Sequence, residues 1–467
     1  MELKYFIFLL AMIGVIPLTL LLMLSPKWMK ICVFLLPICF WKYQSTTINF
    51  FTNPGYKGTA LGYEISIIHL LAIALLAAMF LQQWPAKLLL PGIGFYVLYF
   101  FICLLSLNAS PNLLYSGFEI FKMITLLIAF LALANYFYLT HDFDSFLNGV
   151  AVLIIINFFI SMEMKYIIGG KWQIKGIFPH QNSMGMFMCL VGPLYLARAI
   201  SKKENIIFSI IYLGIFFLTF LSTLFTYSRG SIICYPLGCA VTIFITAIFH
   251  FTQKTMIVLC VTGVFTVLAI CYAVPRIMFR FESAAQSSAE TRQLLAATAM
   301  NIIKDKPFLG CGINTWGIVA KDPKYNVYTP DVAYGEDRYM GIVETTYLLV
   351  GAECGILGLT ALICWYLYYL FQGVYQAFRW RKTDYFYLLS GLVGGFTSNY
   401  FQSTLEWVLK QQVNFCMLIW CFGIVAALVQ NAKENTFLSK LEFIAQRKEL
   451  LQKRYEEMMA RKQQKVA

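Results

Sequence analysis

The sequence predicts an all-α protein that crosses a membrane many times, and its composition and apolar runs carry this prediction. Of the 467 residues, 60% are hydrophobic and only 13% are charged. A soluble protein carries about 25% charged residues. The hydrophobic residues are gathered into long runs separated by polar segments, which is typical of a polytopic integral membrane protein.

Thirteen apolar runs have a length close to that needed to cross the hydrocarbon layer as a helix, which is about 17 to 25 residues. They cover residues 5–24, 28–41, 65–81, 88–107, 113–133, 146–161, 184–197, 206–227, 231–250, 256–272, 347–371, 386–401 and 413–429. Because the run at 28–41 is short, we expect about 12 or 13 spans. The first run follows Lys4, as in a signal peptide, but it lacks a small-residue cleavage site, so we expect it to remain as a membrane helix.

Short loops rich in Lys and Arg predict which helix ends face the cytoplasm. Basic residues cluster at 198–203, at 379–382 and in the C-terminal tail. Counting spans from these loops places three polar segments outside, namely residues 162–183, the turn at 227–230 and a large insert at 273–346. We therefore predict that these three segments meet at one face of the membrane.

The same pattern divides the chain into four parts. An N-terminal transmembrane bundle (1–272) precedes the external loop (273–346), a second set of helices (347–430) and a basic tail (431–467). The net charge of +13 would suggest nucleic acid for a soluble chain, but here it indicates anionic lipid headgroups and no nucleic acid. Apolar residues recur in the tail at steps of four and three, which predicts either an amphipathic helix on the cytoplasmic lipid surface or a homo-oligomer formed through a short coiled coil.

The sequence offers no case for a metal or another cofactor. Most of the 13 cysteines lie in apolar runs, where they behave as small hydrophobic residues. There is no group of His and Cys at metal-binding spacing, no glycine-rich phosphate loop after a strand and no serine nucleophile elbow.

Several cations fall on the predicted outer side. Arg229 lies in a turn between two apolar runs, where it is either an interface anchor or a fixed cation whose planar fork matches phosphate oxygens. Lys175 belongs to a loop with two further lysines, which outer loops normally avoid, so either an anionic ligand or the opposite orientation would explain it. Arg276, Arg280 and Arg292 add positive charge in the insert.

Three other residues are candidates for proton transfer or ligand contact. His180 and Asn182 come just before the run at 184–197, and Asn182 is either a helix cap or a ligand contact. Glu344 lies three residues before the run at 347–371, where a carboxylate either favours the helix N-terminus or accepts a proton.

The insert itself contains recognisable helix and turn signals. Residues 287–290 read Ser-Ser-Ala-Glu, which predicts a capping box that opens a helix. This helix is expected to pass through Arg292 and to stop before Pro307. Gly310 and Gly312 then predict a turn that returns the chain to the membrane.

Four of these segments together resemble the O-antigen ligase and polymerase superfamily of bacterial membrane glycosyltransferases. The matching stretches are GIFPHQN at 176–182, YSRG at 227–230, Thr291-Arg292 followed by KPFLGCG at 306–312, and ETTYLLVGAECGILGL at 344–359. Their order, with one large external loop among them, is more specific than any stretch alone. The resemblance covers roughly residues 165–359.

The resemblance implies a GT-C-like membrane fold and a defined chemistry. A glycan carried on undecaprenyl diphosphate is moved, outside the bacterial cytoplasmic membrane, onto a hydroxyl of a glycan or glycolipid acceptor, with inversion and without a metal. The family's external arginines hold the diphosphate, a role that transfers to Arg229 and Arg292. The ligase branch has a His-Asn pair where this chain has Glu344-Thr345, so Glu344 becomes the candidate base, with His180 as the second candidate.

Two other classes of function stay open from the residues alone. A transporter or flippase for a lipid-linked or anionic solute would show paired charges near the middle of the membrane and inverted internal repeats. A scaffold acting through its cytoplasmic tail would depend on residues 433–467. The choice between polymerase and ligase is also left open.

Overall fold

The structure is a computed structural model that describes residues 2–53, 55–82, 86–169, 173–202, 204–283, 285–327 and 341–434. Within these residues, each of the thirteen predicted apolar runs falls on a helix. The helices are α1 (Glu2–Leu24), α2 (Pro26–Ile38), α4 (Ile67–Leu81), α5 (Ile93–Ser106), α6 (Leu113–Thr140), α7 (Asp144–Met162), α8 (Gln181–Ile200), α9 (Ile206–Thr226), α10 (Arg229–Phe249), α11 (Gln253–Ser283), α14 (Thr346–Arg379), α15 (Tyr385–Gln402) and α16 (Gln412–Glu434).

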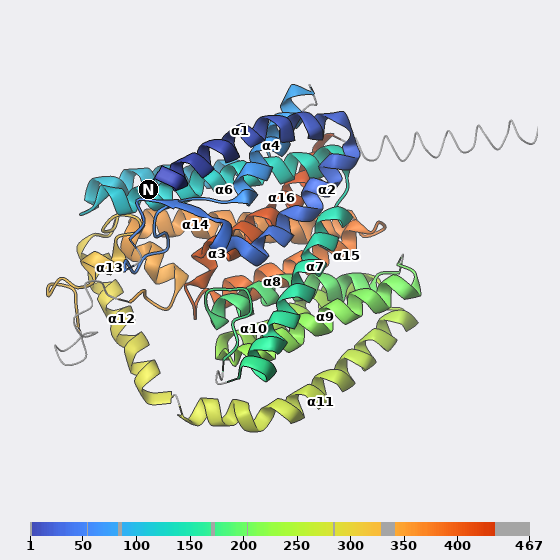
Figure 1. Cartoon of the computed structure of the whole chain (residues 1–467). Helices are drawn as coiled ribbons and strands as arrows, with labels where there is room; N and C mark the ends of the chain where they lie inside the picture. Colours follow the sequence, from blue (N-terminus) through green and yellow to red (C-terminus); the bar gives the residue numbers. More distant parts are fainter. Residues whose placement is uncertain are drawn as a thin grey trace, which may run out of the picture.

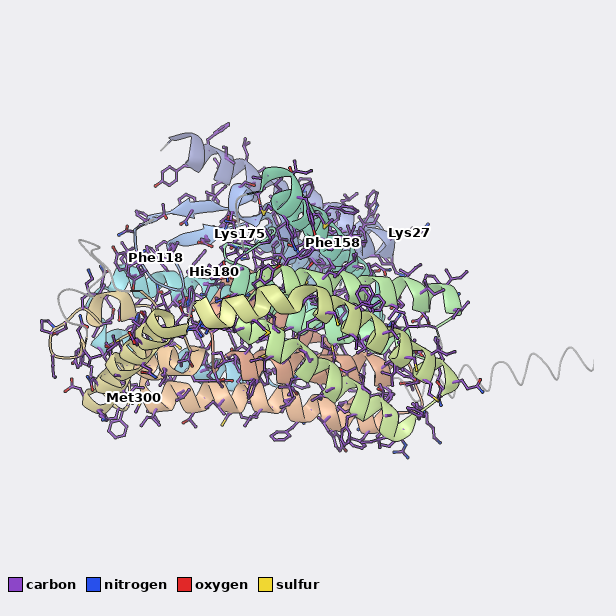
Figure 2. All side chains as sticks on the ribbon, turned by 90° about the horizontal axis from the view of Figure 1, so that it is seen from below. Lys27, Phe118, Phe158, Lys175, His180 and Met300 are labelled. Atoms are coloured by element: carbon purple, nitrogen blue, oxygen red, sulfur yellow. The ribbon has the colours of Figure 1, made fainter. Side chains whose placement is uncertain are left out.

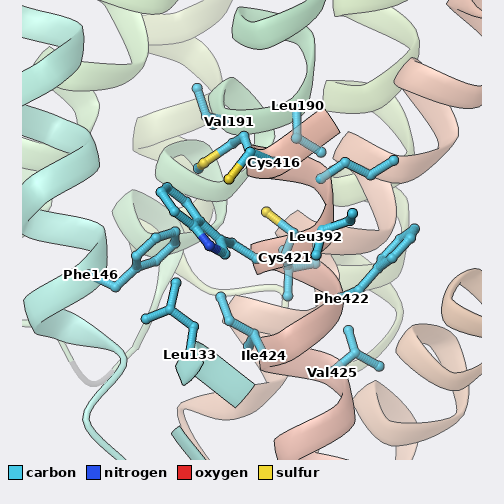
Figure 3. Close-up of a cluster of buried hydrophobic side chains, with 14 of the residues drawn as sticks. Leu133, Phe146, Leu190, Val191, Leu392, Cys416, Cys421, Phe422, Ile424 and Val425 are labelled. Atoms are coloured by element: carbon cyan, nitrogen blue, oxygen red, sulfur yellow. The ribbon is translucent and has the colours of Figure 1, made fainter. Parts of the chain in front are cut away.

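Length and composition confirm the predicted all-α membrane fold. In the described part of the chain, eight helices are long and apolar enough to cross a membrane, and three further helical segments are apolar but shorter. Almost all of α8 and α16 is buried, so these two helices form the centre of the bundle. Figure 3 shows part of this core, where α16 side chains meet Leu133 of α6, Phe146 of α7, Leu190 of α8 and Leu392 of α15.

Glycines allow the central helices to approach closely. A Cβ atom added at Gly394 of α15 would lie 2.4 Å from the carbonyl oxygen of Gly238 in α10, and one added at Gly395 would lie 2.2 Å from the carbonyl oxygen of Leu190 in α8. Because nothing larger than hydrogen fits at these positions, α15 packs directly on the backbones of its two neighbours.

The smaller elements lie between the long helices. A short hairpin between α2 and α4, which the apolar runs did not predict, pairs β1 (Ile48–Phe50) with β2 (Tyr63–Ile65) in antiparallel register, with Ile48 opposite Ile65. The remaining elements are η1 (Cys39–Lys42), α3 (Tyr43–Thr46), η2 (Leu107–Ala109), η3 (Glu163–Ile168), α12 (Ala285–Asp305), α13 (Trp316–Val319) and η4 (Val408–Lys410).

The two ends of the bundle differ in chemistry (Figure 1). The basic loops gather at one end, where Arg198 pairs with Asp144 and Glu204, and where Arg379 donates to the carbonyl of Ala432 near the end of α16. The insert helices α12 and α13 lie at the opposite end. This arrangement agrees with the prediction from the loop charges that the basic loops lie on one side of the membrane and the insert on the other.

The insert differs from its prediction at its start. The helix α11 continues to Ser283, past the predicted boundary at 272/273. The next helix, α12, begins at Ala285. Ser287 therefore lies inside α12, and the predicted capping box does not open this helix. The predicted end before Pro307 is confirmed, because α12 ends at Asp305. The tail beyond Glu434 lies outside the described residues, so both interpretations of it stay predictions.

The predicted glycine turn docks into a break in α14. Gly355 has a φ of 68° and interrupts the helix, which frees the carbonyls of the preceding turn. The amide of Cys311 donates to Ala352 O at 2.9 Å, and the amide of Gly312 donates to Glu353 O at 2.9 Å. Gly310 and Gly312 both have positive φ, as the turn requires. Backbone hydrogen bonds therefore hold the insert to the membrane helix.

A buried network of four charged side chains joins the same region to the N-terminal half. Lys122 Nζ lies 2.5 Å from Glu119 Oε2 in α6, and Lys410 Nζ lies 3.4 Å from Glu119 Oε1 and 3.9 Å from Glu353 Oε2. Each of the four side chains is at most 6% exposed. Charges removed from water in this way stabilise the fold only while they remain paired.

Replacing Lys410 by methionine is expected to destabilise the fold by about 3–5 kcal/mol, because it leaves Glu353 buried without a cation. The measurement is the apparent Tm of the purified protein in detergent. Lys42→Met is the matched control, since Lys42 is exposed and such a substitution changes stability by about 0.5 kcal/mol or less. An unchanged Tm for Lys410→Met would show that the network does not stabilise the fold.

Candidate active site

Five segments that are far apart in sequence meet at the insert end of the bundle. They are the N-termini of α8 and α10, the helix α12, the residues that lead into α14, and the connection between α15 and η4. In Figure 2, Lys175 and His180 lie close together towards the end that carries Met300 of α12, whereas Lys27 lies at the other end. The predicted convergence of polar segments is therefore present in the structure.

An arginine and two carboxyl groups form the centre of this region. Arg292 Nη2 lies 3.3 Å from Glu406 Oε1 and 3.7 Å from Glu344 Oε2. The side chains of Arg292 and Glu344 are 35% and 34% exposed, whereas Glu406 is 3% exposed. Glu344 is thus the carboxyl group that an incoming molecule can reach, and Glu406 lies behind it.

Hydrogen bonds fix the backbone around these residues. Thr346, the first residue of α14, is hydrogen-bonded to the connection after α15. Its amide donates to Ser403 O at 3.0 Å, and its hydroxyl donates to Glu406 O at 3.0 Å. Thr345 Oγ1 also donates to Ser403 O at 3.2 Å. Hydrogen bonds therefore link the segment that carries Glu344 to the segment that carries Glu406.

The loop before α8 supplies the next two candidates. Asn182 Nδ2 donates to Glu406 Oε2 at 2.7 Å, so the asparagine contacts the carboxyl pair. His180 caps α8, with its Nδ1 accepting the amide of Asn182 at 3.2 Å. An imidazole whose Nδ1 accepts carries its proton on Nε2, and this arrangement does not leave a nitrogen free to take up a proton. His180 therefore caps α8, and its role as the second candidate base stays a prediction.

The pKa of His180 is also shifted by its surroundings. It is lowered from the ordinary value, mainly because the surrounding chain excludes water from part of the ring, and also because Lys175 is nearby, while Glu344 opposes the shift. A lowered pKa keeps the ring neutral at pH 7. His180 thus acts as a cap and a hydrogen-bond donor in this geometry.

The N-terminus of α10 closes the site on another side. Arg229 is its first residue and is half-buried. A Cβ atom added at the neighbouring Gly230 would lie 3.8 Å from Glu406 Cγ and 3.8 Å from Gln402 Cγ, so this turn packs against the segment that carries Glu406. A helix N-terminus with an arginine favours a bound anion.

Burial and the neighbouring carboxylate change the acidity of Glu406. Burial is the largest cause that raises its pKa to about 8, the charge of Glu344 and their mutual hydrogen bond raise it further, and Arg292 and Asn182 oppose the shift. Two carboxyl groups this close share one proton near neutral pH. Glu406 therefore keeps its proton at neutral pH.

Glu406 is the functional candidate that the sequence analysis missed. It stands as one acidic residue in the short connection between the apolar runs 386–401 and 413–429. Counting spans places this connection on the same side as the insert, so an acidic residue there was the available signal. Its contacts with Arg292 and Asn182 depend on tertiary packing, which single-sequence patterns do not encode.

The wild-type protein is expected to lose stability as the pH rises from 5 to 8, and replacing Glu406 by glutamine is expected to reduce this loss. In the wild type, folded Glu406 keeps its proton up to about pH 8, while its ordinary pKa is 4.5. The folded state binds more protons than the unfolded state in this window, so the free energy of unfolding falls as pH rises through it. Apparent Tm values of both proteins across this range provide the measurement, and identical slopes would contradict the assigned acidity.

The structure says less about the other predicted site residues. Lys175 lies close enough to His180 to affect its pKa. Arg276 and Arg280 belong to α11, but their side chains lie outside the described set, so their role in ligand binding stays a prediction. Among the described residues, no group of three or more His, Cys, Asp or Glu side chains has the geometry of a metal site.

Two spaces are lined by residues close in the chain to the candidate site residues. A groove of about 400 Å³ lies between η3, α7, α9 and α11, and it is lined by Phe158, Met162, Lys165, Tyr166, Leu221, Leu224, Phe225, Tyr227, Phe265 and Leu268. Its one cation, Lys165, lies 3.9 Å from the ring centroid of Phe225. Tyr227 is two residues before Arg229, so the groove ends beside the N-terminus of α10. The second space, a cavity of about 200 Å³, borders Phe178, Pro179 and Trp407.

Comparison with known proteins agrees with this geometry. Residues 214–363 match the family described as O-antigen ligase. The matched segment runs from α9 into α14 and contains Arg229, Arg292 and Glu344. No curated protein matches the chain.

The matched family supports a membrane glycosyltransferase-type role in O-antigen assembly in the bacterial inner membrane. The order of α9, α10, the insert and α14 is the part of the fold that carries the match. The match at residues 214–363 supports the resemblance of this part of the chain to the O-antigen ligase and polymerase superfamily.

Proposed function

We propose that this protein transfers a glycan from undecaprenyl diphosphate to a hydroxyl group of an acceptor glycan or glycolipid on the outer side of the cytoplasmic membrane. The observation that carries the proposal is the cluster of Arg292, Glu344 and Glu406, which joins the matched segment to the connection after α15. The basic loops at the opposite end of the bundle support an extracytoplasmic site.

The reaction proceeds as one displacement with inversion. The acceptor oxygen forms a bond to the anomeric carbon while the bond from that carbon to the diphosphate oxygen breaks. Glu344 takes the proton of the acceptor hydroxyl, since its side chain is 34% exposed and is the carboxyl group of the pair that an acceptor can reach. Glu406 retains its proton and donates a hydrogen bond to Glu344, which holds the base in position.

The leaving diphosphate gains charge as its bond breaks. Arg229, at the N-terminus of α10, holds this group, and Arg292 adds a second cation beside the base. Cations placed before the reaction stabilise developing charge most where water is excluded. Lys175 and Lys165 supply further positive charge towards the lipid, and the chain's own cations thereby perform the role that a metal performs in other transferases.

The apolar groove supports a lipid-linked donor. Its walls are aliphatic and aromatic, and its single cation, Lys165, lies on the side of Tyr227 and Arg229. A polyprenyl chain in the groove would place its diphosphate near Arg229. The helix α11 forms one wall and is largely exposed on its other face, as expected of a helix that borders lipid.

The direct test uses the purified protein and an undecaprenyl-diphosphate-linked oligosaccharide. Transfer is expected to release undecaprenyl diphosphate and to lengthen the acceptor. A ladder of products identifies a polymerase, whereas one added unit on a different acceptor identifies a ligase. If neither the released carrier nor a larger glycan is detected with any lipid-linked donor, the proposed function is wrong.

The buried charges described above bear on the alternative of a transporter or flippase. Such a protein is expected to pair charges near the middle of the membrane. Glu119 and Glu353 instead lie within the first two turns of α6 and α14, and Lys410 lies in η4 outside the long helices. The network therefore favours a structural joint between the insert and the bundle over a transport pathway.

A further inference from the structure

The second of these spaces has features of a sugar site. It is a cavity of about 200 Å³ enclosed by three segments that adjoin α3 and the hairpin, the loop before α8, and the connection into α16. Its lining consists of Tyr43, Gln44, Gly58, Thr59, Leu61, Glu64, Ile177, Phe178, Pro179, Trp407, Gln411, Gln412, Val413 and Asn414. A space of this size is suited to one pyranose ring.

The cavity is lined by residues that neighbour the candidate site in the chain. Trp407 is the residue after Glu406, and Pro179 is the residue before His180. The apolar groove is lined by Tyr227, two residues before Arg229. The two spaces are therefore lined by different segments of the chain.

The lining combines the two kinds of group that bind sugars. Aromatic rings such as Tyr43 and Trp407 present apolar faces to the C–H face of a ring, while amides and carboxylates exchange hydrogen bonds with its hydroxyls. Apart from Glu64 no lining residue is ionisable at neutral pH, since the remaining polar side chains are amides, hydroxyls or an indole. This chemistry matches a polyol better than a phosphate.

Two lining amides have polar atoms without partners. Asn414 is 2% exposed, and its Nδ2 donates to Ser183 O and Val408 O. Within the described residues, Asn414 Oδ1 and Gln412 Oε1 accept no hydrogen bond. A buried acceptor without a donor costs free energy, so its presence on a cavity wall indicates a ligand that donates hydrogen bonds.

We infer that this cavity binds the sugar ring of the acceptor whose hydroxyl is glycosylated, an inference that rests on the proposed function. Inversion requires the acceptor oxygen and the leaving diphosphate on opposite sides of the anomeric carbon, and the cavity and the groove supply two separate approaches. All cavity residues also lie outside the matched segment 214–363, whereas Arg229, Arg292 and Glu344 lie inside it. The two arginines proposed to hold the diphosphate and the proposed base therefore belong to the matched segment, and the cavity proposed for the acceptor belongs to the remainder of the chain.

The test measures binding and transfer separately with the full-length protein. The probe is a fluorescently labelled oligosaccharide repeat unit released from the surface polysaccharide of the source strain. The protein is kept in a detergent without a sugar headgroup, because a glycosidic detergent would compete for the cavity. Asn414→Leu and Gln412→Leu remove the two unpaired acceptors, and Gln430→Leu, on the same helix at its other end, is the matched control.

We expect Asn414→Leu and Gln412→Leu to weaken probe binding by about tenfold or more and to raise the acceptor KM by the same factor. The donor KM should not change, and Gln430→Leu should behave as wild type. Gln412 is half-buried, so its variant keeps the test decisive if Asn414→Leu does not fold.

Unchanged binding in Gln412→Leu, or no probe binding by the wild type, would overturn the acceptor site. Binding that the variants weaken, in a wild-type protein that transfers no glycan, would support the sugar site and reject the proposed reaction instead. The two failures are therefore distinguishable.

Discussion

Glu344→Gln is expected to slow glycan transfer by about 10²–10⁴-fold, the contribution that a positioned general base makes. Glutamine keeps the shape of the side chain but cannot take the proton of the acceptor hydroxyl. Glu406 does not replace it, because its side chain is 3% exposed and lies behind Glu344. The measurement is the initial rate with purified protein, lipid-linked donor and acceptor.

The matched control is Glu163→Gln, which removes an exposed carboxylate from η3 outside the carboxyl pair. This variant should retain the wild-type rate. Glu344→Asp should give an intermediate rate, because it keeps a carboxylate but shortens its reach. A wild-type rate for Glu344→Gln would exclude Glu344 as the base.

Arg229→Ala is expected to lower the rate by about 10²–10³-fold, the effect of removing one preorganised group that stabilises developing charge. Arg229→Lys should restore part of the rate, since lysine keeps the charge but loses the planar fork that binds two phosphate oxygens. The apparent Tm of both variants should stay close to that of the wild type.

A cation at the opposite end of the bundle provides the control for Arg229. Arg381 is exposed and its side chain donates only to Phe378 O among the described contacts, at 3.5 Å. Arg381→Ala should leave transfer unchanged. Equal rates for Arg229→Ala and Arg381→Ala would show that the arginine at α10 does not hold the diphosphate.

Apolar runs predicted the helices well because the bilayer imposes the same requirement on every span. A backbone in hydrocarbon must satisfy its own hydrogen bonds, so each long apolar run becomes a helix. The helix α9 ends one residue before its predicted run, and α15 begins one residue earlier and ends one residue later than its run. By contrast, the break of α14 at Gly355 is stabilised by amides of the turn at 311–312, and such a partner from a distant segment leaves no periodic signal.

The site was predictable only in part for the same reason. Arg229, Arg292 and Glu344 stood out as charged residues in outer segments, and their proximity followed from counting spans. The role of Glu406 depends on its burial and on its contacts with Arg292 and Asn182, which come from two other segments. His180 also has a contact that the sequence did not predict, because its Nδ1 accepts the amide of Asn182 and caps α8.

Cysteine labelling in spheroplasts tests the central claim most directly, which is that the cations and the carboxyl pair meet on the outer face of the membrane. Arg229→Cys, Glu344→Cys and Arg381→Cys are made singly in a background without the 13 native cysteines. A membrane-impermeant maleimide should label positions 229 and 344 from outside and position 381 only after lysis. Labelling of 229 and 344 from opposite sides of the membrane would contradict the shared site.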